Sequence, residues 1–312
     1  MTRQASSLAY LVEQAADLIS GQGLTPATLA EPPTSVSDAL SRAISLLPTT
    51  NHLNLEPIRT IHHFSCTGGT LFAKCLAAMA NTLVLNEIDL HSTMTPSASG
   101  QALFTPTDMI SLVRQGDQAP DPELISDLFL ADLAVLRETQ WKIGRSVVLR
   151  DHSHSHFLTG SEIRPQPTLL ETVASRFPTR SVVTVRNPID SWLSMQKQGW
   201  HETFQPSTFD EYCRRYLSFV SSYNTVARFK YEDFVGDPNN TLRAICDHLH
   251  LGFFDGFADS FSLFSFSGDS GRKGKKIGAR SHHQGREEIL EMYNDHRVVR
   301  DCFASLEYEF SL

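Results

Sequence analysis

Short runs of β-branched residues recur along the chain from residue 58 onward, and longer stretches with helical periodicity separate them. Five of these runs predict β-strands, at 59–64, 82–87, 146–152, 181–186 and 227–231. Strands that are spaced this widely by helices are typical of a parallel sheet with helices on both faces. The pattern therefore predicts a three-layer α/β domain over residues 58–312.

Helical periodicity predicts further elements around these strands. The predicted helices include one at 70–79, directly after a Gly-rich turn, and two within 106–140. Near the start of the chain, apolar residues recur at helical spacing over 8–19 and 37–47. Residues 1–57 are therefore predicted to form an N-terminal helical extension, either a cap on the main domain or a regulatory module.

Composition and charge limit the classes of partner. The chain has 312 residues, of which 41% are hydrophobic and 20% charged, as in an ordinary globular protein. Its formal net charge of -8 would repel nucleic acid and anionic lipid, so we expect neither as a partner. An anionic ligand would need a locally basic site. No pattern indicates an oligomeric state.

The spacing of the cysteines and the pattern of the first residues indicate the cellular compartment of the protein. Five cysteines are scattered without the spacing of metal ligands or of a disulfide framework. They are Cys66, Cys75, Cys213, Cys246 and Cys302. No signal sequence and no apolar run of membrane-spanning length is recognisable. These features predict a cytoplasmic protein without a membrane partner.

A Gly-rich loop follows the first predicted strand and precedes a predicted helix. Adjacent glycines allow successive N–H groups to point inward, and the helix N-terminus adds unpaired N–H groups. Such a loop suits a phosphate or sulfate, although an ordinary Gly-rich turn is the alternative. It lacks the G-K-[ST] of a Walker A motif and the G-x-G-x-x-G of a dinucleotide site. Its residues are Ser65, Cys66, Thr67, Gly68, Gly69 and Thr70.

Two further segments carry candidate anion-binding residues. Arg186 ends a predicted strand, Pro188 suits the first turn of the next helix, and Ser194 lies two turns along it. A guanidinium in this position can fork around a phosphate, or it can form a surface ion pair. Residues 271–280 contain five basic residues and several glycines, which suits either a ligand-closing loop or a solvated one.

The segment Arg-Asn-Pro-Ile-Asp-Ser-Trp-Leu-Ser at 186–194 resembles the 3′-phosphate-binding segment of the sulfotransferase superfamily. Tyr-Glu-Asp-Phe at 231–234 resembles a further segment of that family, and the resemblance spans about residues 58–280. It implies a P-loop-like fold and a soluble enzyme of bacterial type that uses 3′-phosphoadenosine 5′-phosphosulfate (PAPS). The implied acceptor is a hydroxyl or amine of a small molecule or carbohydrate, and no metal is implied.

The same resemblance implies roles for residues of each segment. The loop at 65–70 corresponds to the 5′-phosphosulfate loop, and Arg186 and Ser194 would bind the 3′-phosphate. The basic segment is similar to a loop that closes over that phosphate, with Arg272, Lys273 and Gly274 as the best match.

Candidate general bases follow the second and third predicted strands. If the chain stays extended after Asp151, His152, His154 and His156 share one face. Imidazole is a suitable base near neutral pH, and the resemblance to a K-T-H segment makes His152 the first candidate. Glu87 is the rival, because some bacterial sulfotransferases use a glutamate there. A zinc site on the histidines is a further alternative.

One position departs from the family pattern. Sulfotransferases usually have a lysine or arginine just before the Ser/Thr-Gly of the first loop, where this chain has Cys66. Lys74, one turn into the following helix, or a basic residue of 271–280 is a candidate replacement. Cys66 itself is an alternative nucleophile, since a helix N-terminus favours thiolate.

The function predicted is sulfuryl transfer from PAPS. Two other classes stay open at this point. A P-loop-like kinase of a small metabolite would require ATP and magnesium, and the missing loop lysine argues against it. A non-catalytic nucleotide-binding protein would explain Cys66.

Overall fold

The computed structural model describes residues 56–92, 94, 107–116, 121–267, 276–278 and 285–311. These residues belong to a compact unit formed by residues 53–312. The predicted N-terminal extension at 1–57, apart from its last two residues, lies outside the described residues. So do Arg272, Lys273 and Gly274 of the basic segment.

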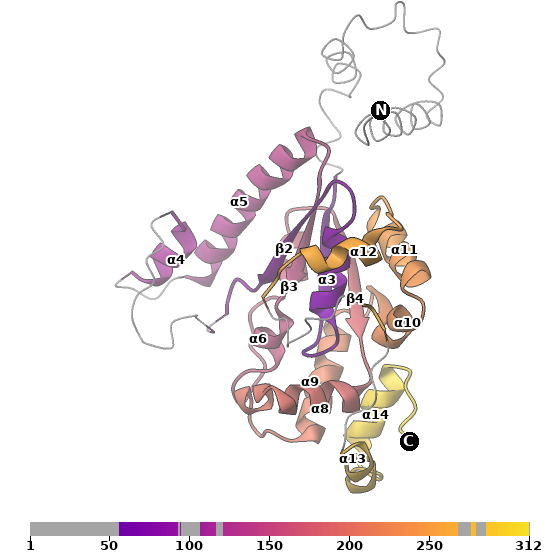
Figure 1. Cartoon of the computed structure of the whole chain (residues 1–312). Coiled ribbons are helices and arrows are strands. Elements are labelled where there is room, and N and C mark those ends of the chain that lie inside the picture. Colours follow the sequence, from indigo (N-terminus) through magenta and orange to yellow (C-terminus); the bar gives the residue numbers. More distant parts are fainter. Residues whose placement is uncertain are drawn as a thin grey trace, which may run out of the picture. The chain divides into compact units, whose positions relative to one another are not determined.

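The described chain contains a parallel sheet of five strands in the order β2-β3-β1-β4-β5. The strands are β1 (Ile58–His63), β2 (Thr82–Ile88), β3 (Ser146–Asp151), β4 (Thr179–Val185) and β5 (Ala227–Lys230). Each lies within two residues of its predicted bounds, so the predicted α/β fold is confirmed. Figure 1 shows the sheet with helices around it.

Helices lie in every crossover between consecutive strands, and further helices follow β5. They are α3 (Gly69–Ala77), α4 (Met109–Arg114), α5 (Pro122–Lys142), α6 (Ser153–Phe157), α7 (Leu169–Ala174), α8 (Pro188–Lys197), α9 (Phe209–Ser222), α10 (Tyr231–Gly236), α11 (Pro238–Leu249), α12 (Phe257–Ser260), α13 (Arg286–Met292) and α14 (Arg297–Ser305). Short 3₁₀ turns occur at Trp200–Thr203 and Phe261–Leu263. Within the described ranges, no helix is both long and apolar enough to cross a bilayer.

Alternating residues of the strands supply a core on each face of the sheet. In β4, Val182 packs with α3, α11 and α12, whereas Val183 and Val185 pack with α8, α9 and α14. A third cluster joins β3 to α5 and α7. Because successive side chains of a strand point to opposite faces, both faces are buried, which gives the predicted three layers.

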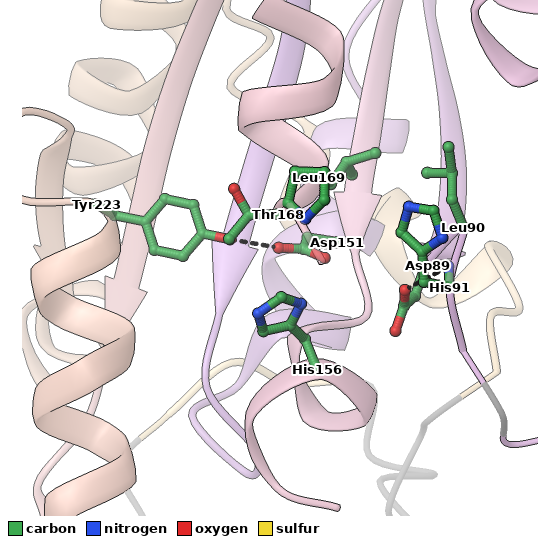
Figure 2. Close-up of a pocket in the computed structure, with 9 residues that line it drawn as sticks. Asp89, Leu90, His91, Asp151, His156, Thr168, Leu169 and Tyr223 are labelled. Atoms are coloured by element: carbon green, nitrogen blue, oxygen red, sulfur yellow. Dashed lines mark hydrogen bonds between the residues drawn. The ribbon is translucent and has the colours of Figure 1, made fainter. Parts of the chain in front are cut away.

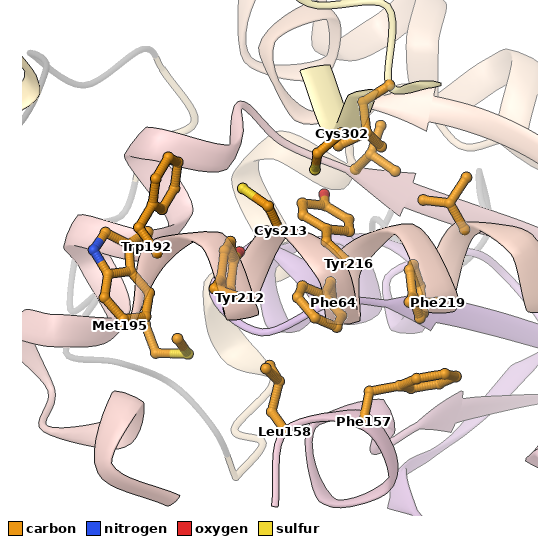
Figure 3. Packing of buried hydrophobic residues seen from close by; sticks show 14 of the residues in the cluster. Phe64, Phe157, Leu158, Trp192, Met195, Tyr212, Cys213, Tyr216, Phe219 and Cys302 are labelled. Atoms are coloured by element: carbon orange, nitrogen blue, oxygen red, sulfur yellow. The ribbon is translucent and has the colours of Figure 1, made fainter. Parts of the chain in front are cut away.

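An aromatic cluster supports the point where β1 becomes the first loop. Phe64 is fully buried, and its ring stacks on Tyr216 with centroids 4.4 Å apart. Tyr212 and Phe219 of the same helix, α9, lie 5.2 and 5.3 Å from the Phe64 ring (Figure 3). The residue just before the loop is therefore fixed against α9.

The chain does not stay extended after Asp151, so the condition under which the three histidines would share one face is not met. The last sheet hydrogen bond runs from His152 N to Ile88 O, where β2 ends. Beyond that point the chain has no neighbouring strand to pair with, and it turns into α6, with the hydrogen bond from Ser155 N to His152 O. The three histidines therefore do not share one extended face.

Candidate functional site

The predicted site residues come from neighbouring strand ends. The Gly-rich loop follows β1, and Glu87 is the next-to-last residue of β2. His152 follows β3, and Arg186 follows β4. These four strands are adjacent and parallel. Their carboxyl ends therefore meet at one edge, which is where ligands bind in open α/β sheets.

Both loop glycines are required by close contacts. Gly68 has a φ of +91°, and a Cβ there would lie 2.5 Å from the ring of Tyr231. A Cβ on Gly69 would lie 2.2 Å from the ring of His63. The loop is therefore packed between the β5–α10 junction and the end of β1.

The beginning of α3 is suited to an anion. Gly68 precedes the helix and provides no side-chain cap, and no acidic residue lies in the first turn. The positive end of the helix dipole is therefore uncompensated by the chain itself. The residues present fit a phosphate or sulfate group at this point.

We expect Gly69→Ala to lower the free energy of unfolding by about 1–3 kcal/mol, as overpacking in a tight core does. The added methyl group would overlap the buried His63 ring. Denaturant titration measures the change. Gly236→Ala, in α10, is the control and should keep wild-type stability, because no atom lies within 4 Å of the position that its methyl group would take. Equal stability of both variants would contradict the tight fit.

Cys66 and Thr67 are engaged within the loop. Burial raises the pKa of the Cys66 thiol, against the opposing effects of Ser65, Ser194 and Arg186. At neutral pH Cys66 is therefore a thiol, which makes it a poor nucleophile. Thr67 is buried, and its hydroxyl donates to the Phe64 carbonyl at 2.7 Å. This hydrogen bond of the Thr67 hydroxyl closes the turn of the loop.

The predicted 3′-phosphate residues lie at the Cys66 end of this loop. Arg186 Nη1 donates to the Cys66 carbonyl at 3.1 Å, and the guanidinium carbon lies 4.9 Å from the centroid of the Tyr231 ring. Ser194 is close enough to the Cys66 thiol to hydrogen-bond it. The first loop, the Arg-Asn-Pro segment and the Tyr-Glu-Asp-Phe segment thus meet in one place.

Glu232 explains why the Tyr-Glu-Asp-Phe segment belongs to this site. Its carboxylate accepts the Asn187 N–H at 3.0 Å and the Tyr308 hydroxyl at 2.5 Å. Asn187 in turn caps α8, accepting from Ile189 N at 3.0 Å. Glu232 therefore fixes the turn that carries Arg186 and connects it to the C-terminal segment.

Arg150 joins the opposite end of the loop to the ends of β1 and β2. Its side chain is 3% exposed. Nη2 donates to Thr70 Oγ1 at 3.1 Å and Nε to His63 Nε2 at 2.9 Å. Nη1 donates to Asn86 Oδ1 at 2.6 Å and lies 3.4 Å from a Glu87 carboxylate oxygen. A buried positive charge therefore stands beside the N-terminus of α3.

Glu87 reaches Arg150 because the end of β2 is irregular. The register between β2 and β3 shifts between Leu85 and Ile88, and Glu87 has a φ of +56°. Such irregularities re-aim side chains and are frequent next to active sites. The Glu87 carboxylate is 19% exposed and lies at the edge where the loop ends.

His152 lies directly before α6 and next to Glu87. Its Nδ1 is 2.9 Å from Ser155 Oγ. Burial lowers the pKa of the His152 imidazole, and the nearby carboxylates of Glu87 and Asp89 oppose that effect. The ring is therefore neutral at pH 7, as a general base must be.

The other two histidines have different surroundings. Burial lowers the pKa of His154 to about 4, and its Nε2 lies 3.3 Å from Thr203 Oγ1. His156 lines a separate polar pocket (Figure 2), where burial also lowers its pKa. In the part of the chain that the structure describes, no three His, Cys, Asp or Glu residues converge as metal ligands would.

A buried polar network lies beneath His152. Asp151, its neighbour in sequence, lies 2.7 Å from His62 Nδ1 and accepts the Tyr223 hydroxyl at 2.9 Å (Figure 2). His62 Nε2 continues to Thr60 Oγ1 at 2.8 Å. The end of β3 is therefore fixed by side chains from β1 and from the residue just after α9.

Lys74, our candidate for the missing cation, shares a face of α3 with Thr70. It lies one turn further along, about 6 Å from Thr70 by the rise of an α-helix. Arg150 donates a hydrogen bond to Thr70 at 3.1 Å. Sequence reasoning missed Arg150, His63, Ser155 and Asp89 as site residues. The one available signal was a basic residue at the end of a buried strand, two positions before His152.

The fold and the site define an α/β protein with an uncapped helix N-terminus at the carboxyl ends of its parallel strands, an arrangement that suits an anionic group. Residues 131–255 match the model of the sulfotransferase family. The sulfotransferase domain from the curacin biosynthetic pathway shares the fold, with a TM-score of 0.51 and 18% identity over 82% of this chain and 99% of that one. Part of this chain thus matches the sulfotransferase family, and its fold is similar to that of a sulfotransferase domain.

Two other sulfotransferase structures align less well. The domain from the Synechococcus PCC 7002 olefin synthase has a TM-score of 0.47 and 17% identity, covering 84% of this chain and 98% of that one. A mouse sulfotransferase complexed with PAP has a TM-score of 0.39 and 14% identity, covering 86% and 96%. No curated protein sequence matches this chain.

Proposed function

We propose that this protein transfers a sulfuryl group from PAPS to a hydroxyl or amine of a small-molecule or carbohydrate acceptor. The observation that carries the proposal is the pair of guanidinium groups at the two ends of one anion-binding loop. Arg150 contacts Thr70, and Arg186 contacts the carbonyl of Cys66. PAPS carries anionic groups at two positions, the 5′-phosphosulfate and the 3′-phosphate.

Arg150 is the cation that the sequence lacks at position 66. It is charged at any pH at which the protein is folded, and it stands beside the N-terminus of α3, where the 5′-phosphate would bind. Charge that develops on the leaving phosphate is stabilised by such a preorganised, buried donor. In this proposal Glu87 and Asn86 hold the guanidinium in position.

His152 is the general base. Among the described residues its Nε2 has no hydrogen-bond partner, whereas the Glu87 carboxylate already contacts Arg150. Nε2 takes the proton of the acceptor as the acceptor atom forms its bond to sulfur. The bond between sulfur and the 5′-phosphate oxygen breaks, and adenosine 3′,5′-bisphosphate leaves. The step requires no metal ion.

Arg186 and Ser194 hold the 3′-phosphate, remote from the reacting sulfur. Only one of the five N–H groups of Arg186 is used within the described chain, in the contact with Cys66. Binding energy from this remote group positions the donor for transfer. The basic segment with Arg272, Lys273 and Gly274 would add charge at the same phosphate.

Calorimetry with adenosine 3′,5′-bisphosphate tests this assignment. We expect binding to the wild type and a loss of about 10- to 100-fold in affinity for Arg186→Ala, the value of a charge-assisted hydrogen bond. Arg180→Ala is the matched control, because Arg180 lies at the other end of β4 and is bonded to the His248 carbonyl.

Two further results are expected if the protein transfers a sulfuryl group from PAPS. Labelled PAPS should give a sulfated product with some member of a broad acceptor panel, and ATP with magnesium should not compete for the site. Absence of heat with adenosine 3′,5′-bisphosphate on folded protein would refute sulfuryl transfer. Binding of ATP with magnesium, without binding of adenosine 3′,5′-bisphosphate, would favour a P-loop-like kinase of a small metabolite as the function.

A further inference from the structure

A series of hydrogen-bonded side chains leads from His152 through Ser155 to Asp89. The Nδ1 of His152 is 2.9 Å from Ser155 Oγ, and the Ser155 hydroxyl makes a short hydrogen bond to Asp89 Oδ2. Ser155 is 2% exposed, and the Asp89 side chain is 9% exposed. Asp89 follows β2 and Ser155 belongs to α6, so the contact connects segments 66 positions apart.

The direction of the hydrogen bonds follows from the groups involved. A carboxylate only accepts, and so does the carbonyl oxygen of His152, which lies 2.9 Å from the same hydroxyl. The hydroxyl hydrogen of Ser155 is therefore donated to Asp89 or shared with that carbonyl. A hydroxyl has a single hydrogen, and therefore none remains for the imidazole. Ser155 Oγ must accept from His152, which requires the hydrogen on Nδ1.

We propose that Ser155 and Asp89 are positioning residues, which keep His152 in the tautomer with a protonated Nδ1 and an unprotonated Nε2. The inference rests on the proposed role of His152 as general base. The tautomer leaves the Nε2 lone pair available for the acceptor's proton. A carboxylate that orients an imidazole serves the same purpose in hydrolases, but here a serine hydroxyl stands between the two groups.

Asp89 is itself fixed from two further directions. Arg164 makes a short ion pair with the oxygen that accepts from Ser155. The backbone N–H of His91 donates to the other oxygen at 3.0 Å. Both contacts hold the carboxylate in place beside the Ser155 hydroxyl.

Several charged and titratable groups surround His152, so a change in its pH dependence has to be attributed with care. They are Glu87 and Asp89 at the end of β2, Arg150 and Asp151 of β3, His63 of β1 and His154 of α6. The Asp89 carboxylate acts to raise the pKa of His152. Asp89→Asn should therefore move the acid limb of the rate profile to lower pH, whereas Ser155→Ala leaves that charge in place.

The direct experiment is a long-range ¹⁵N–¹H correlation spectrum of the full chain labelled at histidine, with His152 assigned by comparison with His152→Gln. We expect the wild type to show a protonated Nδ1 and an unprotonated Nε2 at neutral pH. In Ser155→Ala we expect the Nε2-protonated form to gain population. The wild-type spectrum requires no variant at Ser155 or Asp89 to fold.

Turnover of PAPS provides the second readout. Ser155→Ala and Asp89→Asn should each lower kcat by about 10- to 100-fold, less than the loss of a general base itself. The double variant should lose no more than the worse single one, because both act through His152. Ser155→Thr, which keeps the hydroxyl, should recover most of kcat. Thr159→Ala is the control, since Thr159 donates to the Ser155 carbonyl and not to this chain of hydrogen bonds.

The outcomes separate the inference from the proposed function. An Nε2-protonated His152 in the folded wild type, or fully additive losses in the double variant, would overturn the positioning role. The expected tautomer in a protein that turns over no PAPS would support the positioning role and refute the proposed function.

Discussion

Replacement of His152 by alanine is expected to lower kcat by about 10²- to 10⁴-fold, the usual contribution of a general base. The affinity for adenosine 3′,5′-bisphosphate should not change, because none of the donor-binding residues that the structure describes is hydrogen-bonded to the imidazole. His152 makes no side-chain cap to α6, so the variant should fold. Steady-state kinetics with labelled PAPS and calorimetry measure the two quantities.

The pH dependence of kcat/KM tests the same role of His152, and the direction of that dependence can be predicted. A base must be neutral to accept a proton, and burial lowers the pKa of His152 below the ordinary value of 6.5. In the wild type the acid limb of kcat/KM should therefore have its midpoint below pH 6.5. The acid limb should disappear in His152→Ala.

Glu87→Gln distinguishes the rival base. If Glu87 acts by holding Arg150, its amide variant should keep the acid limb of His152 and a larger kcat than His152→Ala. A greater loss in Glu87→Gln, with wild-type kcat in His152→Ala, would transfer the role of base to Glu87.

The second large effect is expected at Arg150. Arg150→Gln should lower kcat by about 10²- to 10³-fold, as the loss of a single preorganised electrostatic donor does. The affinity for adenosine 3′,5′-bisphosphate should fall much less, because the charge acts on the reaction's developing negative charge. Arg150→Lys keeps the charge without the fork and should show an intermediate kcat.

Stability has to be measured alongside, because Arg150 is buried among His63, Asn86 and Glu87. Arg145→Gln is the matched control, since Arg145 is exposed just before the amino end of the same strand, β3. A folded Arg150→Gln protein with wild-type kcat would show that the cation of the site lies elsewhere.

The local patterns were sufficient to predict the fold. Buried strands of a parallel sheet are short apolar runs at wide spacing, and each of the five is visible without its neighbours. Helix signals such as Asn187 followed by Pro188 are equally local. The misjudged segment lies after Asp151, where the outcome depended on the end of the neighbouring strand β2.

The site could be predicted in part. The glycine pair at 68–69, the Arg-Asn-Pro segment and His152 follow strands whose carboxyl ends must meet, so their proximity follows from the topology. The reason why glycine is required at positions 68 and 69 does not follow from the topology. It depends on the rings of Tyr231 and His63, which only the folded chain brings against the loop.

The sequence by itself determined a parallel α/β sheet with a Gly-rich loop after its first strand, because each of these features is encoded within a few consecutive residues. The tertiary structure decided which cation lies beside that loop and which side chains lie next to His152. Arg150 reaches Thr70 across 80 positions, and Asp89 reaches Ser155 across 66. Such contacts depend on strand register and on the irregular end of β2, which are properties of the packed sheet and leave no periodic signal along the chain.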